Sequence, residues 1–155
     1  MPALPWSDGL ALGVAFMDDT HKEFVELLAR TEAADAADLP ALWDALVAHT
    51  ADHFGREDEW MLATGFALGN CHMTQHKVVL QVLREGAQHA KEGDLAPIRQ
   101  MIGELAVWFP HHAQTMDAAL ALHLRGVGYD PATGEVREPQ RMPAEAITGC
   151  GGSCS

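Results

Sequence analysis

The chain has 155 residues, of which 48% are hydrophobic, and a formal net charge of −12. This length fits one domain with a sizeable core, and the negative charge argues against a surface for nucleic acid or anionic membranes. No long apolar run and no basic segment followed by an apolar one are present, so we expect neither a membrane span nor a secretory leader. The three cysteines, Cys71, Cys150 and Cys154, imply no disulfide framework and fit a reducing cytoplasm.

Hydrophobic periodicity predicts an N-terminal arm followed by four helices. Residues 1–17 contain two prolines and two glycines and are expected to form an arm that covers part of the protein. The first helix is predicted to begin near Asp18–Thr20 and to fade within residues 32–38. The later helices are predicted over residues 40–63, over residues 70–91 and from Asp94 to Gly126.

Amphipathic helices of this length, joined by short loops, favour an antiparallel up-down-up-down four-helix bundle. We therefore predict an all-α fold in which residues 1–125 form the bundle. Residues 126–155 are rich in proline, glycine and charge and are expected to form an irregular C-terminal tail. Pro110 removes a backbone donor inside the fourth helix and is expected to kink it just before His112.

Every predicted helix carries histidine on its apolar face. The segments "HFGRE" and "HMTQH" each place two ligand-type side chains four residues apart. This spacing stacks both side chains on one helical face, where they can reach one metal ion. The inward-facing polar residues of the four helices are His21, His53, Glu57, His72, His76, His112 and Asp117.

A metal centre is the interpretation that best explains so many polar groups in one core. A single inward-facing histidine is usually a hydrogen-bonded core residue, but this whole set would cost a few kcal/mol per group if left unpaired. Seven ligands exceed the four of a tetrahedral zinc site. They fit two six-coordinate ions if both carboxylates bridge, with a bridging oxygen and one open position. Imidazole with carboxylate suits iron, manganese, zinc or copper, and spacing does not choose among them.

The segment "WFPHHAQTMD" contains two adjacent histidines that an α-helix points about 100° apart. His112 shares its face with Leu105 and Phe109, so we expect His112 to be a ligand and His111 to be solvated. Asp117 follows five residues later and falls about 140° around an α-helix from His112. It is therefore expected to reach the centre obliquely, from the flank of the helix.

Over about residues 4–125 the chain resembles the bacterial single-domain hemerythrins. The resemblance rests on "LPWSDGLALGV", "DDTHKEF", "HFGRED", "HMTQH" and "HHAQTMD", which fill all seven positions of the family pattern. It implies that His72, His76 and His112 hold one iron and that His21 and His53 hold a second. Two carboxylates, those of Glu57 and Asp117, would bridge both irons.

The resemblance implies a cofactor of two iron ions, Fe2+ or Fe3+, with a bridging oxo or hydroxo group. The implied function is reversible binding of O2 as a hydroperoxide at the two-histidine iron, for oxygen storage, delivery or sensing. Aromatic residues near the ligands are expected to form a dry O2 pocket, or simply ordinary core: Phe24, Phe54, Trp108 and Phe109.

Two other functions use the same ligands. One is a diiron redox enzyme of the peroxidase, ferroxidase or nitric-oxide reductase type, and the other is an iron storage or detoxification module. No nucleophile, general acid or phosphate loop converges on the site, so we expect no catalytic residues. We expect a cytoplasmic monomer without nucleic-acid or membrane partners; a sensor would need a separate protein to receive its signal.

The remaining histidines and cysteines are expected to have lesser roles. His49 is one helical turn before His53 and is expected to lie behind the ligands or in the core. His89 and His123 have no partner at useful spacing and are expected at the surface or rim. For the segment "CGGSC", which contains Cys150 and Cys154, metal binding and a disulfide stay open beside the simpler expectation of no role.

Overall fold

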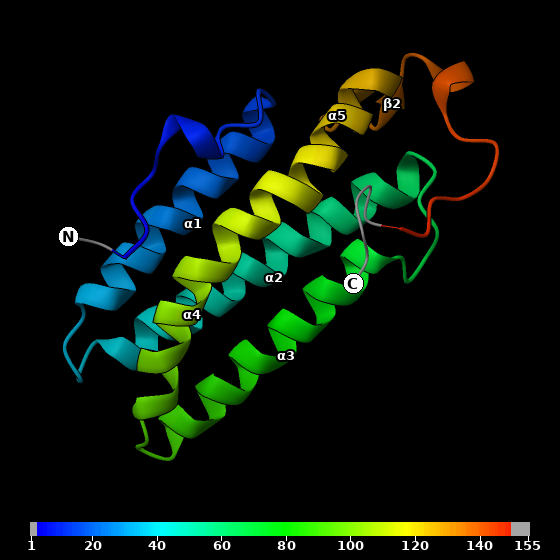
Figure 1. Cartoon of the computed structure of the whole chain (residues 1–155). Helices are drawn as coiled ribbons and strands as arrows, with labels where there is room; N and C mark the ends of the chain where they lie inside the picture. Colours follow the sequence, from blue (N-terminus) through cyan, green and yellow to red (C-terminus); the bar gives the residue numbers. More distant parts are fainter. Residues whose placement is uncertain (1–2, 150–155) are drawn as a thin grey trace.

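The computed structural model describes residues 3–149 as a helical bundle (Figure 1). Its helices are α1 (Ala15–Ala33), α2 (Leu39–Ala63), α3 (Cys71–Lys91), α4 (Ala96–His112) and α5 (Ala118–Val127). Helices α1 and α3 each pack against both α2 and α4, and α5 continues the column of α4. The predicted all-α four-helix bundle is confirmed. Within residues 3–149, no helix has the length and apolar character needed to cross a membrane.

Local sequence explains where the later helices begin. The side chain of Asn70 accepts a hydrogen bond of 3.0 Å from the backbone N–H of Met73 and so caps α3. Pro40 and Pro97 lie in the first turns of α2 and α4, where no intrahelical donor is needed. The predicted positions of these three helix starts agree with the structure to within two residues.

The N-terminal arm is tied to the first turn of α1. The carboxylate of Asp18 accepts a hydrogen bond of 2.7 Å from the backbone N–H of Leu12. Helix α1 therefore begins at Ala15, three residues before the predicted start, because Asp18 binds the arm from inside the helix instead of capping its end. As predicted, the arm covers the core, into which it buries Leu4 and Leu10.

The sequence predicts one continuous α-helix for the fourth helical column, but this prediction is wrong. Regular α-helix ends at His112, two residues after Pro110, and Ala113–Asp117 (η2) form a turn of π-helix before α5 begins. Backbone hydrogen bonds in a π-helix join residues five apart, whereas those in an α-helix join residues four apart. A change of helix type therefore follows Pro110, where a simple kink was expected.

Two apolar clusters fill the core, and the layer of predicted ligands lies between them. Cluster I includes Leu28, Trp43, Leu46, Leu83, Ile98 and Ile102. Cluster II includes Met17, Trp60, Met61, Met73, Leu120 and Leu124. In α2, for example, the chain passes from Leu46 in cluster I through His53 and Glu57 to Trp60 in cluster II. The polar residues thus form a layer across the middle of the bundle.

The C-terminal tail is more ordered than the sequence predicted. It forms a short antiparallel hairpin of β1 (Tyr129–Asp130) and β2 (Glu135–Val136), followed by a 3-10 turn, η3 (Pro139–Arg141). The tail then returns to the loop between α2 and α3. There the backbone N–H of Ile147 donates to the carbonyl of Gly65 at 3.0 Å, and that of Ala67 donates to the carbonyl of Ile147 at 2.8 Å.

The tail also reaches the start of α3. The backbone N–H of Cys71 donates to the carbonyl of Thr148 at 3.0 Å, and the side chain of Cys71 is disulfide-bonded. The inference from the cysteines to a reducing compartment is therefore not supported, because Cys71 is disulfide-bonded. The expectations for Cys150 and Cys154 lie outside the described residues.

Replacement of Cys71 by serine is expected to destabilise the protein by about 2–4 kcal/mol, the typical contribution of a disulfide. The loss arises because the unfolded chain regains freedom that the covalent bond removes. Urea unfolding of the oxidised variant and of the oxidised wild-type protein would measure it. Addition of a thiol reductant should destabilise the wild-type protein and leave Cys71→Ser unchanged; equal stability of the two oxidised proteins would contradict the prediction.

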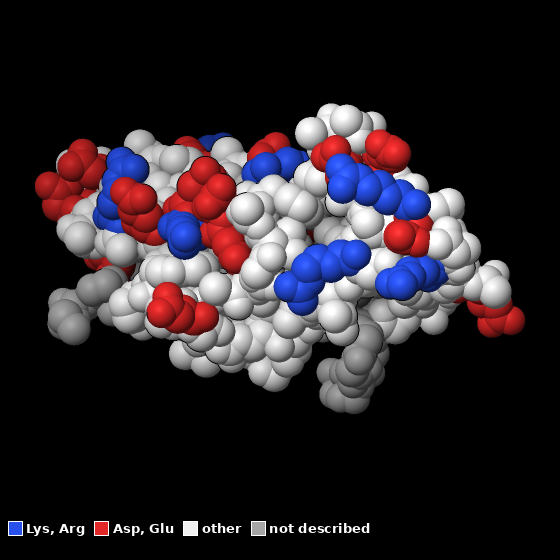
Figure 2. Space-filling view, turned by 90° about the horizontal axis from the view of Figure 1, so that it is seen from above, with Lys and Arg blue, Asp and Glu red and all other residues white. Residues whose placement is uncertain are grey.

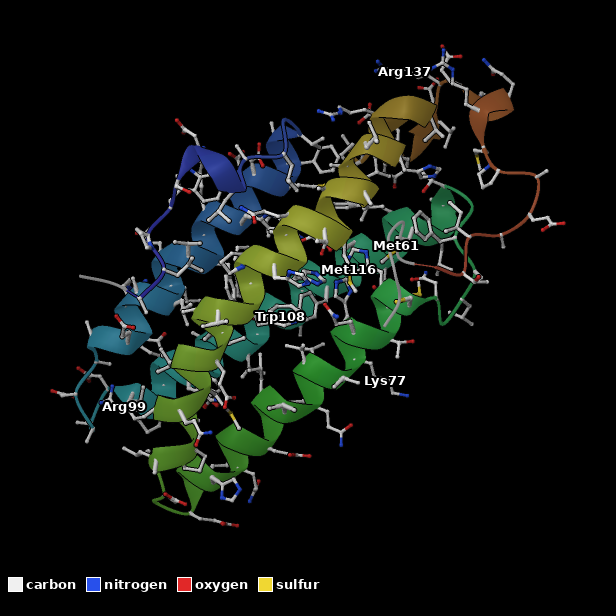
Figure 3. The ribbon with its side chains drawn as sticks, viewed as in Figure 1. Met61, Lys77, Arg99, Trp108, Met116 and Arg137 are labelled. Atoms are coloured by element: carbon white, nitrogen blue, oxygen red, sulfur yellow. The ribbon has the colours of Figure 1, made fainter. Side chains whose placement is uncertain are left out.

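The negative net charge is not gathered into one acidic patch on the face shown in Figure 2. Acidic and basic side chains alternate over that face, with uncharged surface between them. The side chain of Lys77 extends away from the bundle (Figure 3), whereas Trp108 lies closer to its middle. The guanidinium of Arg99 donates to the backbone carbonyls of Glu32 and Ala34 at 3.2 and 2.7 Å.

Candidate metal centre

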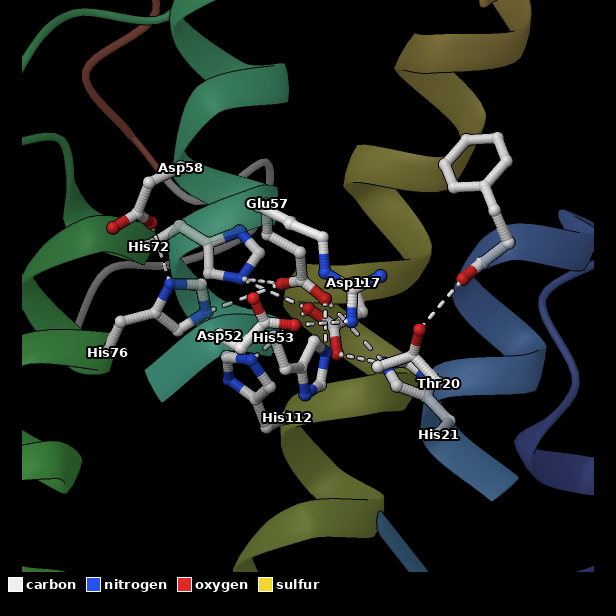
Figure 4. Close-up of polar contacts among 12 residues, drawn as sticks. Thr20, His21, Asp52, His53, Glu57, Asp58, His72, His76, His112 and Asp117 are labelled. Atoms are coloured by element: carbon white, nitrogen blue, oxygen red, sulfur yellow. Dashed lines mark hydrogen bonds and ion pairs between the residues drawn. The ribbon is translucent and has the colours of Figure 1, made fainter. Parts of the chain in front are cut away.

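The polar layer brings together side chains from all four helical columns (Figure 4). Each of them is at most 2% exposed, although every one carries a titratable group. The members are the seven predicted residues: His21, His53, Glu57, His72, His76, His112 and Asp117. The structure therefore places the complete predicted set in one buried site.

The carboxylate of Glu57 lies between two groups of histidines. Its Oε2 atom lies 2.6 Å from Nε2 of His53 and 3.7 Å from Nε2 of His21. Its Oε1 atom lies 3.4 Å from Nε2 of His76 and 3.5 Å from Nε2 of His72. One carboxylate therefore offers one oxygen to each group.

Asp117 repeats this arrangement from the opposite side of the bundle. Its Oδ2 atom lies 3.2 Å from Nε2 of His21, while Oδ1 lies 3.1 Å from Nε2 of His72 and 3.2 Å from Nε2 of His112. The site thus consists of a three-His half (His72, His76, His112) and a two-His half (His21, His53). Both halves share the two carboxylates, and within each half the possible ligand atoms lie within 4.8 Å of one another.

Four of the five inner imidazole nitrogens lack ordinary hydrogen-bond partners among the described residues, the exception being Nε2 of His53. Among the described residues, no partner of acceptable geometry is found for Nε2 of His21, His72, His76 and His112, nor for either carboxylate oxygen of Asp117. Buried polar atoms are normally satisfied, and leaving one unpaired costs about 1–3 kcal/mol. Lone pairs that converge in this way fit a cation in each half of the site.

Comparison with known proteins agrees with this geometry. The profile of the family described as "Hemerythrin HHE cation binding domain" matches residues 12–124, a span that contains all seven residues. The chain belongs to the hemerythrin family. It is 38% identical to a bacteriohemerythrin of Ralstonia nicotianae over 130 residues, which cover 84% of this chain and 95% of the relative.

Two other bacteriohemerythrins match a smaller share of this chain, with lower identity. That of Stenotrophomonas maltophilia is 27% identical over 127 residues, covering 78% of this chain and 81% of the relative. One from Pseudomonas aeruginosa is 25% identical over 122 residues, covering 76% and 79%. No solved structure matches the chain significantly.

Without a metal ion, the imidazoles and carboxylates of the site compensate one another. Burial acts to lower the pKa of His21, but the nearby carboxylates of Asp117 and Glu57 raise it to about 10. The same carboxylates raise the pKa of His72 to about 9 against the effect of burial. Burial acts to raise the pKa of Glu57 and Asp117, but the surrounding histidines hold both well below their usual range. For His112, burial prevails and lowers the pKa. Metal binding must therefore displace protons from this site.

The metal-free protein is expected to lose stability as the pH rises from about 6.5 to about 10. The pKa values of His21 and His72 in the folded state, about 10 and about 9, exceed the 6.5 of an unperturbed histidine. Their contribution to stability is therefore complete below pH 6.5 and is lost as the pH passes through the folded-state values. Thermal unfolding should show a Tm lower by roughly 5 °C at the alkaline end, equivalent to about 2 kcal/mol. The metal-loaded protein should lack this decrease; a flat Tm in the metal-free protein would contradict the prediction.

Aromatic rings pack against both halves of the hemerythrin site. Phe54 stacks on His76 with ring centroids 4.0 Å apart, and Trp108 stacks on His112 at 4.4 Å. Phe109 meets His21 edge-on at 5.1 Å. Phe24 lies behind Phe109 at 4.6 Å. Of the four residues predicted to form an O2 pocket, Phe24 and Phe109 therefore lie on the two-His side, whereas Phe54 and Trp108 lie mainly against the three-His half.

The other histidines lie outside the polar layer. His111 is exposed, as predicted, and so is His89. His49 bonds through Nε2 to the carboxylate of Glu23 at 3.1 Å, and its ring lies 6.3 Å from that of His53. His123 is half-buried at the rim, where its Nε2 donates to the carbonyl of Thr64 at 2.8 Å.

Two features of the site were not predicted from the sequence. The π-turn η2 places Asp117 one π-helical hydrogen-bond step from His112, so the expected oblique approach from the helix flank is wrong. Asp58 and Gln75 contact the outer nitrogens of two imidazoles. The only signal for them in the sequence is that each lies directly next to a predicted ligand.

Proposed function

We propose that this protein holds two iron ions and binds O2 reversibly, for oxygen storage, delivery or sensing. The observation that carries the proposal is the sharing of Glu57 and Asp117 between the two halves of the site. Each carboxylate directs one oxygen atom to each half, as a bridge between two ions requires.

The proposed ligands leave the two ions unequal. Three imidazoles and two carboxylate oxygens give five protein ligands in the three-His half, and two imidazoles with two carboxylate oxygens give four in the two-His half. With a bridging oxo or hydroxo group, the first ion would have six ligands and the second would have five. An octahedral preference would then leave one position open in the two-His half. A pair of ferrous ions supplies the two electrons that O2 accepts on binding and returns on release.

The surroundings of the two-His half support carriage in preference to turnover. Phe24 and Phe109 are 2% and 1% exposed; Phe109 packs against His21, and Phe24 packs against Phe109. A shell of this kind limits the access of water and protons, which would otherwise remove reduced oxygen from the site. We therefore assign the O2 pocket to Phe24 and Phe109.

The direct test is reversibility. The protein is loaded with iron, reduced without oxygen and exposed to O2 while its visible charge-transfer absorption is recorded. A stable oxygenated spectrum that returns to the reduced one under argon supports carriage. Immediate oxidation of the iron, with turnover of added peroxide or nitric oxide, would show a diiron redox enzyme instead. A metal content far above two ions per chain would indicate storage.

One observation favours the redox enzyme as a second candidate. The ring of His49 lies 6.3 Å from that of His53 and bonds to the carboxylate of Glu23, which is 64% exposed, whereas His49 is only 18% exposed. A polar pair in this position weakens the exclusion of water that the aromatic rings provide. The reversibility experiment decides between the two candidates.

Variants of the adjacent histidines are expected to behave very differently. His112→Ala removes an inner nitrogen that lies 3.2 Å from Asp117, so it should lower the iron content or destabilise the oxygenated form. His111→Ala changes only an exposed ring and serves as the matched control. Iron analysis and the decay of the oxygenated spectrum measure both effects. Equal behaviour of the two variants would contradict the assignment of His112.

A further inference from the structure

The outer nitrogens of the imidazoles are held differently in the two halves of the site. In the three-His half, Nδ1 of His76 donates to the carboxylate of Asp58 at 2.8 Å, a contact drawn in Figure 4. Nδ1 of His112 donates to the side-chain oxygen of Gln75 at 2.6 Å. A hydrogen bond at Nδ1 fixes the tautomer and the ring orientation, so that the lone pair of Nε2 faces the interior.

The two-His half has no such support. Among the described residues, Nδ1 of His21 and Nδ1 of His53 have no hydrogen-bond partner. Instead, His21 is held by the edge-on contact with Phe109 and by the ring of His53, whose centroid lies 5.0 Å away. Packing restrains these rings, but it neither selects their tautomer nor increases the electron density at Nε2.

The supporting residues also connect the helices to one another. Asp58 follows the shared ligand Glu57 on α2 and holds a ligand of α3. Gln75 precedes His76 on α3 and holds a ligand at the end of α4. The side chain of Asp58 is 34% exposed, whereas that of His76 is 1% exposed. A carboxylate that keeps contact with water can thus strengthen a buried imidazole as a donor without itself being fully desolvated.

We propose that Asp58 and Gln75 are positioning residues that make the three-His half the tighter of two unequal metal sites, which fills first and empties last. The ion in the two-His half is then the exchangeable one. The inference rests on the proposed binding of two metal ions. It adds the order in which they bind and the residues that set this order.

Titration of the metal-free protein with Co2+ tests the order of filling. The first equivalent should shift and broaden the imidazole NMR signals of His76 and His112, and the second those of His21 and His53. Competition with a chromophoric chelator gives the two affinities. If the wild-type protein binds fewer than two Co2+ ions, the proposed function fails; if it binds two but the two-His half fills first, only the present inference is overturned.

Variants identify the residues that set the order. Asp58→Ala and Gln75→Ala should each lower the affinity for the first Co2+ ion by about ten- to a hundredfold and leave the affinity for the second nearly unchanged. Asp58→Asn keeps an acceptor without its charge and should give an intermediate loss; it also decides the question if Asp58→Ala does not fold. The matched control is Asp52→Ala on the same helix, because Asp52 is 69% exposed and pairs with Arg56 at 3.0 Å. An equal loss of affinity for both ions, or no loss of affinity, would overturn the inference.

Discussion

Asp117→Ala is expected to reduce the metal content of the loaded protein from two ions per chain to about one or fewer. Asp117 offers Oδ2 to the two-His half and Oδ1 to the three-His half, so its removal deprives both ions of a ligand at once. The two-His half should lose its ion first, because Glu57 would be its only remaining carboxylate and no hydrogen bond supports the outer nitrogens of its imidazoles.

Metal analysis after anaerobic loading and gel filtration measures this loss. Asp130→Ala provides the control, since Asp130 lies in β1 outside the polar layer. Circular dichroism of the metal-free variant should show that the helices persist. Two tightly bound ions in Asp117→Ala would exclude the proposed bridging role, whatever the effect on O2 binding.

Insertion of one alanine after Gln114 is expected to abolish metal binding and to destabilise the bundle by at least about 3 kcal/mol. Gln114 lies within η2, whose five-residue step already takes the place of a four-residue α-helical step. One further residue therefore rotates every later residue by about 100° relative to α4. Asp117, Leu120 and Leu124 all follow the insertion, so they leave the polar layer and cluster II together.

The matched control is Gln114→Ala, which keeps the chain length and loses only the exposed hydrogen bond from Gln114 to the carbonyl of Gly9. Urea unfolding and metal analysis of both variants distinguish the effect of the turn's length from the effect of losing the Gln114 side chain. An insertion variant with two bound ions and unchanged stability would show that the spacing through the π-turn is not required.

The fold and the grouping of the seven candidate side chains were largely predictable from the sequence because both depend on local spacing. "HFGRE" and "HMTQH" place two ligands on one face of any α-helix, and the structure finds all four of these side chains in one layer. The bundle follows from amphipathic segments separated by short loops, since each segment must bury its apolar face against the others.

The features that were missed depend on departures from regular spacing or on contacts distant in sequence. An α-helix would place Asp117 on the flank, whereas the π-turn changes the rotation of every following residue. The contact between Asp58 and His76 spans 18 residues and joins two helices, so no single-helix pattern reveals it. The return of the tail to Gly65 and Cys71 uses a few backbone hydrogen bonds and a disulfide, which leave no periodic signal.

The polar layer also has a consequence for how the protein unfolds. It separates cluster I from cluster II, so hydrophobic contacts do not run continuously along the bundle. Without metal, the two ends are joined mainly through the helices themselves and through paired charges. Each end can then open as a separate cooperative unit, which hydrogen exchange would detect as two groups of amides with different protection. Two bound ions would link all four helical columns at this layer and merge the groups into one, so that loss of the metal would divide one folding unit into two.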